Sequence, residues 1–408
     1  MNEMKKPEIR FQGSSDEWEP CTLKDVCISF EYGLNAAAKK FDGKNKYIRI
    51  SDIDDDTRLF LSYDLTSPDC DLRLAENYQL HDGDIVFART GASVGKTFLY
   101  KASEGIVYYA GFLIRAKLKK AYYPDFVFYN TLTNRYGQFI RVTSQRSGQP
   151  GVNAQEYATF KFYNPLYCEQ EKLGQYFRHL DNIIIQRQDK LKKIQTLRAS
   201  MLEKMFPKDG ADVPEVRFKG FTGAWKKYSF KNITYPSGTK NKDNILYESY
   251  SITNESGFVP QNEKFENGGT MKNADKRMYI IVEPHSFAYN PARINIGSIG
   301  YQYLDYNVIV SSLYEVFKTT DECNDQFLWY WFKTKAFDKM IEQLQEGGVR
   351  LYFYYDKLCM CSLKMPDVEE QSKIAEYFKN LDDLISACSK EIDKLQSIKK
   401  ALLEKMFV

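Results

Sequence analysis

Residues 165–206 read PLYCEQEKLGQYFRHLDNIIIQRQDKLKKIQTLRASMLEKMF, and residues 366–407 read PDVEEQSKIAEYFKNLDDLISACSKEIDKLQSIKKALLEKMF. The two stretches align without a gap and end in the same residues, LEKMF. A second match joins PEIRFQGSSDEWEPCTLKDV (7–26) to PEVRFKGFTGAWKKYSFKNI (214–233), with Pro, Glu, Arg, Phe, Gly and Trp in register. The chain is therefore written twice, and a duplication predicts two halves with the same fold.

Each of the two longer repeats has the apolar pattern of a single long helix. Apolar residues recur at alternating spacings of four and three, and no internal proline interrupts them, which is the heptad pattern of paired helices. Such a helix cannot bury its apolar face alone, so we expect the two copies to pack on each other in antiparallel directions. The LEKMFV end of the chain should then lie beside its start, because LEKMFPKDGADVPEVRF (202–218) already makes the same junction internally. The predicted seam residues are Phe177, Leu180, Ile184, Leu191, Ile194, Met201 and Met205 in the first copy and Phe378, Leu381, Ile385, Ile392, Leu395, Leu402 and Met406 in the second.

The segments outside the long helices read as mixed α and β structure. Short runs of β-branched and aromatic residues, such as 84–88 and 278–282, alternate with helical stretches at 124–142 and 325–344. The expected fold class is α+β, with two similar domains separated by two long antiparallel coiled-coil-like helices in a pseudo-two-fold internal repeat. The expected boundaries are a first variable domain at 1–164, a first long helix at 165–206, a linker at 207–214, a second variable domain at 215–365 and a second long helix at 366–408.

The composition is that of a globular protein that acts in the cytoplasm. Of the 408 residues, 43% are hydrophobic and 27% are charged, and no apolar run reaches the roughly 18 residues that a membrane span needs. The eight cysteines include no C-x-x-C pair, and the three histidines lie far apart in the chain. We therefore expect no membrane span, no metal site and no nucleophile triad.

The stretch RTGASVGKT (89–97) imitates a phosphate-binding loop without completing it. A Walker A loop is G-x-x-x-x-G-K-[ST], and the GKT end fits, but Thr90 stands where the first glycine is needed. The corresponding turn in the second half, NPARINIG (290–297), is not followed by a lysine. We therefore expect a turn whose backbone passes close to a partner, and not a nucleotide site.

Positive charge gathers along one part of the first half. Residues 85–150 carry ten basic side chains against two acidic ones, although the net charge of the whole chain is only +3. This segment is a candidate anion-binding surface. Arginine, asparagine and glutamine in flexible turns are the residue types that contact phosphates and read base edges, and the turns at 290–297 and 345–353 also contain them. The candidate DNA-binding residues from charge and residue type are Arg89, Lys96, Arg115, Lys117, Arg141 and Arg146 in the first half and Arg293, Asn295 and Arg350 in the second.

Several motifs taken together resemble the specificity (S) subunit of type I restriction-modification systems over essentially the whole chain. They are the LEKMF ends, the VPEVRF junction (213–218), RTGASVGK (89–96) and QPGVNAQEYATFKF (149–162). The resemblance implies two target recognition domains, each reading one half of a bipartite asymmetric site in double-stranded DNA. It also implies that the paired helices set the spacing and dock two methyltransferase subunits. By position, the resemblance places these residues in DNA-proximal turns: Arg89, Gly91, Gly95, Lys96, Gln149, Gly151 and Asn153, with Arg293 and Gly297 standing in for the first turn in the second half.

The resemblance further implies that the cofactors belong to partner subunits. The methyltransferase subunits would bind S-adenosylmethionine, and two restriction subunits, where present, would use ATP and Mg²⁺. The chain itself would be a non-catalytic subunit that holds no cofactor. The competing hypothesis is a stand-alone sequence-specific DNA-binding regulator, which would bind its site without these partners.

Overall fold

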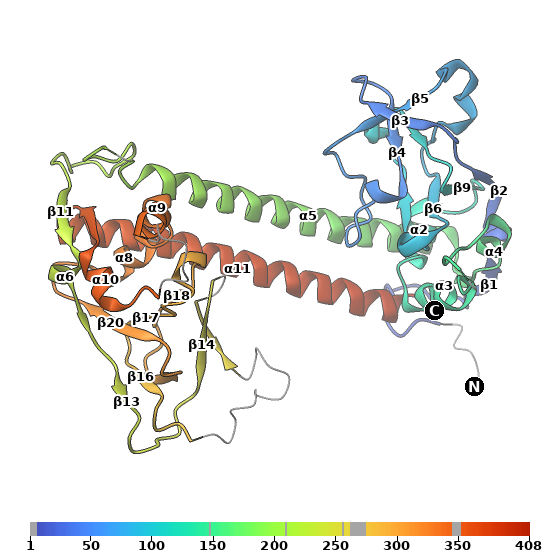
Figure 1. Cartoon of the computed structure of the whole chain (residues 1–408). Helices are drawn as coiled ribbons and strands as arrows, with labels where there is room; N and C mark the ends of the chain where they lie inside the picture. Colours follow the sequence, from blue (N-terminus) through green and yellow to red (C-terminus); the bar gives the residue numbers. More distant parts are fainter. Residues whose placement is uncertain (1–5, 147, 209, 255–256, 262–274, 345–351) are drawn as a thin grey trace. The chain divides into compact units, whose positions relative to one another are not determined.

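The chain folds into two compact units. The computed structural model describes residues 6–146, 148–208, 210–254, 257–261, 275–344 and 352–408. Unit 1 consists of residues 1–189 together with 389–408, and unit 2 consists of residues 190–388. Helices α5 (Tyr167–Lys204) and α11 (Val368–Met406) each give one part to either unit (Figure 1). Each unit therefore contains one variable domain and a piece of both long helices.

A four-stranded antiparallel sheet forms the centre of the unit 1 domain. Its strand order is β2 (Cys27–Tyr32), β9 (Leu113–Leu118), β6 (Ile85–Ala88) and β7 (Thr97–Leu99). All four side chains of β6, IVFA, are buried, which suits a run rich in β-branched and aromatic residues inside a sheet. The smaller strand pairs of unit 1 are β1 (Glu19–Thr22) with β10 (Lys161–Asn164), β3 (Ala37–Lys40) with β5 (Thr66–Asp69) and, in parallel, β4 (Lys46–Ile48) with β8 (Val107–Tyr109).

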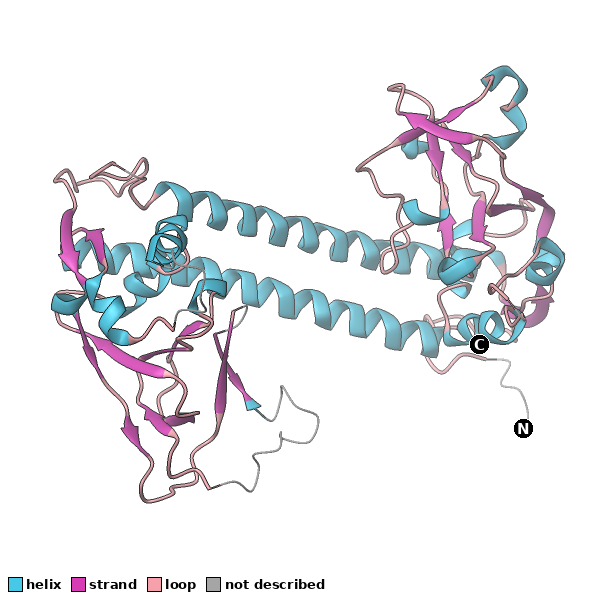
Figure 2. Ribbon diagram, viewed as in Figure 1, coloured by secondary structure: helices cyan, strands magenta, loops and turns pink. Residues whose placement is uncertain are grey.

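Unit 2 repeats this sheet strand for strand. Its order is β12 (Thr234–Pro236), β20 (Glu315–Thr319), β17 (Phe287–Tyr289) and β18 (Ile299–Tyr301), again antiparallel throughout. Figure 2 colours strands magenta and helices cyan. The equal topology confirms the duplicated α+β fold that the sequence repeats predict. The other strands of unit 2 are β11 (Lys226–Ser229) paired with β21 (Ser362–Met365), β14 (Tyr250–Thr253) paired with β15 (Gly257–Pro260), and a sheet of β13 (Thr239–Lys240), β16 (Ile280–Val282) and β19 (Val308–Val310).

The helical stretch of each domain is broken into two short helices. In unit 1 the hydroxyl of Thr131 donates to the carbonyl of Phe128 at the end of the first helix, and the hydroxyl of Thr133 accepts from the Tyr136 amide at the start of the second. Threonine hydroxyls favour such ends and caps over a continuous helix. The short helices are α1 (Leu23–Val26), α2 (Pro124–Asn130), α3 (Asn134–Thr143) and α4 (Ala154–Ala158) in unit 1, and α6 (Phe230–Ile233), α8 (Asp325–Trp331), α9 (Lys335–Leu344) and α10 (Tyr355–Met360) in unit 2. The 3-10 turns are η1 (Ile50–Asp52), η2 (Leu72–Leu74), η3 (Glu76–Tyr78), η4 (Gly91–Ser93), η5 (Ala102–Glu104) and η6 (Ile294–Ile296).

In unit 1 the first part of α5 runs antiparallel to the last part of α11. Asp181 forms an ion pair with Lys399 at 2.6 Å, and Arg187 pairs with Glu391 at 3.0 Å, so residue numbers rise along one helix as they fall along the other. The seam residues of this unit are buried or half-buried: Phe177, Leu180, Ile184, Ile392 and Met406 are buried, and Leu395 and Leu402 are half-buried.

Unit 2 contains the remaining parts of the same two helices, in the same antiparallel sense. Arg198 forms an ion pair with Asp382, and the ring of Phe206, just beyond α5, contacts the ring of Phe378. The seam residues of this unit are also turned inward: Met205, Phe378 and Leu381 are buried, and Leu191, Ile194, Met201 and Ile385 are half-buried.

The end of the chain lies beside its start, as the repeat predicts. In unit 1 the amide of Ile9 donates to the carbonyl of Lys405 at 3.0 Å, and in unit 2 the amide of Val216 donates to the carbonyl of Lys204 at the same distance. Both chain ends belong to unit 1 (Figure 1). The junction after each LEKMF is therefore built in the same way, whether or not the chain continues through it.

Candidate nucleic-acid interface

The turn RTGASVGKT joins β6 to β7 in unit 1 and is held by a buried tyrosine. The hydroxyl of Tyr157 donates to the carbonyl of Ala88 at 2.6 Å and accepts from the amide of Gly95 at 3.1 Å. The hydroxyl of Tyr136 donates to the carbonyl of Gly95 at 3.0 Å. Burial raises the pKa of Tyr157, so its hydroxyl keeps its proton. The side chain of Tyr157 thus ties both ends of the turn together.

Glycine is required at two places in this turn. Gly91 and Gly95 have φ of +71° and +85°, a region that other residues rarely adopt. A Cβ on Gly95 would also lie 2.8 Å from the side chain of Ile140. The glycines of RTGASVGKT are therefore needed for the backbone conformation of the turn.

A second loop runs along this turn and completes a surface that we call the paired loops of unit 1, residues 89–96 and 149–153. The amide of Gly91 donates to the carbonyl of Pro150, and the amide of Val152 donates to the carbonyl of Arg89. Asn153 then caps α4, because its side chain accepts from the amide of Glu156. The structure thus brings together two segments that lie more than 50 residues apart in the sequence.

The amine of Lys96 bonds to two other residues of unit 1. It forms an ion pair with Asp55 at 2.7 Å and donates to the carbonyl of Ile53 at 3.2 Å, and its side chain is only 11% exposed. A P-loop lysine must instead reach a bound phosphate. Lys96 therefore links the paired loops to the acidic turn at 54–57.

Arg115 is a correction to the sequence analysis. We predicted a DNA contact for it, but its side chain is buried and forms ion pairs with Glu31 and, at 3.7 Å, with Asp84. Its guanidinium also donates to the carbonyl of Gln79. Counting basic residues along the chain could not distinguish this internal cation from surface ones.

The other candidates of unit 1 lie at the surface. Lys117 and Arg141 are exposed on β9 and α3, and Gln149 is exposed in the second of the paired loops. Arg146 is also exposed, but it pairs with Glu156 at the start of α4. Arg89 is half-buried at the joint of the paired loops, with its guanidinium over the rings of Tyr32 and Phe112.

Unit 2 has the same pair of loops with different residues. Its first loop joins β17 to β18 and contains Arg293, Asn295 and Gly297, all exposed. The amide of Phe353 donates to the carbonyl of Pro291 at 2.9 Å, which matches the bond from Val152 to Arg89. The paired loops of unit 2 are therefore residues 290–298 and 352–354.

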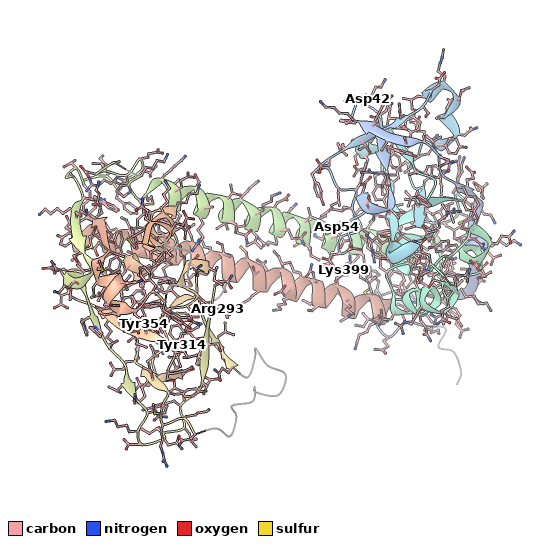
Figure 3. The ribbon with its side chains drawn as sticks, in the orientation of Figure 1. Asp42, Asp54, Arg293, Tyr314, Tyr354 and Lys399 are labelled. Atoms are coloured by element: carbon pink, nitrogen blue, oxygen red, sulfur yellow. The ribbon has the colours of Figure 1, made fainter. Side chains whose placement is uncertain are left out.

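Aromatic rings mark the second of these loops. The rings of Tyr352 and Tyr354 are stacked with centroids 5.6 Å apart, and each side chain is about half exposed. Figure 3 labels Arg293 and Tyr354, one from each loop. Exposed aromatic faces beside a basic side chain suit stacking on bases and attraction to phosphates. Arg350, another candidate, lies outside the described residues.

Two negative findings concern the described part of the chain. There, no group of three His, Cys, Asp or Glu side chains is placed to hold a metal ion. None of the described helices is both long and apolar enough to cross a membrane. Two copies of one fold, each with paired loops at matching positions, define the class as a modular recognition protein with two equivalent loop surfaces.

Comparison with known proteins gives the family. The family model for the type I restriction modification DNA specificity domain matches residues 15–196 and matches again at residues 205–397. Because these two matches cover most of the chain, the chain belongs to this family. Its role is DNA sequence recognition.

Named relatives are similar over most of their length. The chain is 21% identical to the putative type I restriction enzyme MjaX specificity subunit of Methanocaldococcus jannaschii, covering 95% of this chain and 92% of the relative. It is also 21% identical to the type I restriction enzyme MjaVIII specificity subunit of the same organism, covering 79% and 78%.

Solved structures share the fold. The S subunit of a type I restriction-modification system from M. genitalium matches with a TM-score of 0.64 at 13% identity, covering 99% of both chains. A chain from a structure on assembly and conformational transition of the type I R-M system matches with a TM-score of 0.50 at 15% identity, covering 97% of this chain and 99% of that one.

Proposed function

We propose that this chain selects a bipartite site in double-stranded DNA for a type I restriction-modification complex. Each half reads one part of the site through its paired loops. The single observation that carries the proposal concerns the paired loops. Both halves share the same backbone arrangement of these loops, but the side chains on the loops differ. The same backbone bond joins the loops in both halves, yet residues 151–153 read GVN and residues 352–354 read YFY. A duplicated frame with different side chains is what reading two different half-sites requires.

The long helices have two roles in this proposal. Because α5 and α11 are each continuous and contribute to both units, they set the distance between the two half-sites. Their outward faces dock two methyltransferase subunits, which bind S-adenosylmethionine and modify adenine. Two restriction subunits that use ATP and Mg²⁺ join in the full complex. The chain itself supplies recognition and no chemistry.

Selection of DNA by the assembled complex tests this proposal. The chain is co-expressed with the methyltransferase subunit of its own host, and the purified complex selects duplexes from a random library. We expect the selected duplexes to contain two short motifs separated by a fixed gap of unspecified bases. We also expect the chain to select these duplexes strongly only when it is in the complex. A single uninterrupted motif, or equally tight selection by the chain alone, would favour the stand-alone regulator.

A further inference from the structure

Among the described residues of unit 1, the side chain of Arg89 has no partner of opposite charge. Its guanidinium carbon lies 5.1 Å from the ring centre of Tyr32 and 5.9 Å from that of Phe112. No described carboxylate forms an ion pair with Arg89, whereas Arg115 in the same sheet is paired with Glu31. The Nε of Arg89 is buried and donates to no described group. A cation placed on aromatic faces in this way keeps its remaining donors for a ligand.

The backbone around Arg89 is held on both sides. Its amide donates to the carbonyl of Phe112 at 3.0 Å, and its carbonyl accepts from the amide of Val152 at 2.9 Å. The hydroxyl of Tyr32 accepts from the amide of Ala154 at 3.3 Å, which fixes the ring below the guanidinium. Little freedom is left to lose when a ligand binds, and such preorganisation favours specific binding.

The three side chains border a cavity of about 580 Å³ in unit 1. Its described lining contains two arginines and no carboxylate. The other arginine, Arg49, forms an ion pair with Asp52 at 2.8 Å, so Arg89 is the unpaired cation of this lining. Tyr32 and Phe112 are 45% and 57% exposed as residues. The cavity therefore presents positive charge and aromatic faces, which suit a flat ligand with several hydrogen-bond acceptors.

We propose that Arg89 reads a guanine in the half-site recognised by unit 1, with its guanidinium donating to O6 and N7. Tyr32 and Phe112 are positioning residues that hold the plane of the guanidinium. The guanine edge presents two coplanar acceptors that match the arginine fork. A phosphate can also accept two donors from an arginine, but it carries no base identity, so a preference for one base distinguishes the two contacts. This inference rests on the proposed function, because it names one contact within that recognition.

Binding by the complex of the chain with its methyltransferase subunits tests the inference. Affinity is measured for the selected duplex and for duplexes in which each G·C pair of either half-site is replaced by A·T. For Arg89→Lys, which keeps the charge but loses the fork, we expect affinity for the selected duplex to fall about 5- to 150-fold. The preference for G·C should disappear at one position of one half-site. Tyr32→Phe should preserve that preference, and Tyr32→Leu should weaken it.

The control is Arg73→Ala, which removes an exposed arginine of the same unit that pairs with Asp71 and should leave the preference unchanged. Thermal unfolding and binding at the other half-site show that each variant is folded. The inference is overturned if Arg89→Lys keeps the preference, if Arg89→Ala weakens binding equally for all duplexes as a phosphate contact would, or if the half-site contains no guanine. Failure of the proposed function looks different, because the wild-type complex would then select a single uninterrupted motif or no sequence at all, or the chain alone would select as tightly as the complex.

Discussion

At the scale of single residues, a buried ion pair fastens the start of each repeat to a long helix. Arg10 pairs with Glu169 in unit 1, and Arg217 pairs with Glu370 in unit 2, each at 2.7 Å. The Glu370 side chain is fully buried. Both arginines and both glutamates are visible as repeated residues in the sequence. The partners lie 159 and 153 residues apart, however, so no local spacing rule could join them.

Removing one member of this pair should destabilise unit 2 strongly. Glu370→Ala leaves the Arg217 cation without its partner, and breaking a buried pair in this way costs about 3–5 kcal/mol. The matched control is Glu369→Ala, which removes an exposed pair with Lys373 and should cost less than about 1 kcal/mol. Urea unfolding followed by tryptophan fluorescence measures both. Equal losses for the two variants would show that the buried pair has no special role.

The sequence analysis did not select Tyr157, the residue whose hydroxyl holds the turn at 89–97. From sequence alone, a tyrosine in a short helix is usually interpreted as a core residue. Ala88 and Gly95, which bond to its hydroxyl, lie far from it along the chain. The available signal was the joint presence of RTGASVGK and QPGVNAQEYATFKF in one domain. The charge count erred in the opposite direction at Arg115, because residue type along a chain does not report burial.

Tyr157→Phe should loosen the turn at residues 89–97 without removing the ring. The variant loses two hydroxyl hydrogen bonds, and the Gly95 amide keeps only its bond to the carbonyl of Ala88 at 3.0 Å. Each lost hydrogen bond costs about 0.5–1.5 kcal/mol. Hydrogen exchange at the Gly95 amide should become faster, and DNA selection at one half-site should weaken. The control Tyr63→Phe alters an exposed tyrosine and should change neither. Unchanged exchange at Gly95 would contradict the role of this hydroxyl.

At the scale of elements, each long helix carries the same contact to its own domain. The hydroxyl of Tyr129 donates to Asp181 at 2.7 Å in unit 1, and the hydroxyl of Tyr330 donates to Asp382 at 3.0 Å in unit 2. Each aspartate also pairs with a cation of the other long helix. The heptad pattern was sufficient to predict both helices, because apolar periodicity sustained over so many turns is typical of long packed helices. It could not predict which domain residue each helix holds.

Strand lengths were harder to predict than strand positions. The sequence IVYYAGFLIRAKL (106–118) is one continuous run of mostly apolar residues. It forms two strands, β8 and β9, because the chain turns between them at 110–112. The helical stretch at 124–142 forms α2 and α3, because buried threonine hydroxyls bond to the backbone at 131–133. In both cases a local turn, with no periodicity of its own, interrupts a continuous apolar pattern.

Lengthening both long helices should change the spacing of the DNA site. Inserting seven residues after Arg187 and seven after Cys388 adds about 10 Å to each helix at 1.5 Å per residue while keeping the heptad register. That length corresponds to about three base pairs at 3.4 Å each. Mapping of methylated adenines in cells should show unchanged half-sites with a longer gap. The same gap as in the wild type would refute the spacing role of the helices.

At the scale of the whole molecule, the duplication explains why the two units share their fold but differ in the residues of their paired loops. The sheet order, the helix contacts and the junction after LEKMF recur in both units. The residues of the paired loops differ between the units. The shared features hold the loops in place in both units, so they recur. The loop residues differ because recognition of different bases requires different side chains. This division is what the proposed reading of two different half-sites by one chain with two repeated halves requires.

The most direct test replaces residues 7–164 with residues 214–365, so that the chain carries the second domain twice. The repeat alignment and the equal junctions make this exchange compatible with both units. Methylated sites are then mapped across the genome of cells that express this chain with the methyltransferase subunit. Our account predicts that the asymmetric motif becomes two copies of the half-site read by the second domain. Persistence of the half-site read by the first domain, or loss of the second half-site, would contradict it.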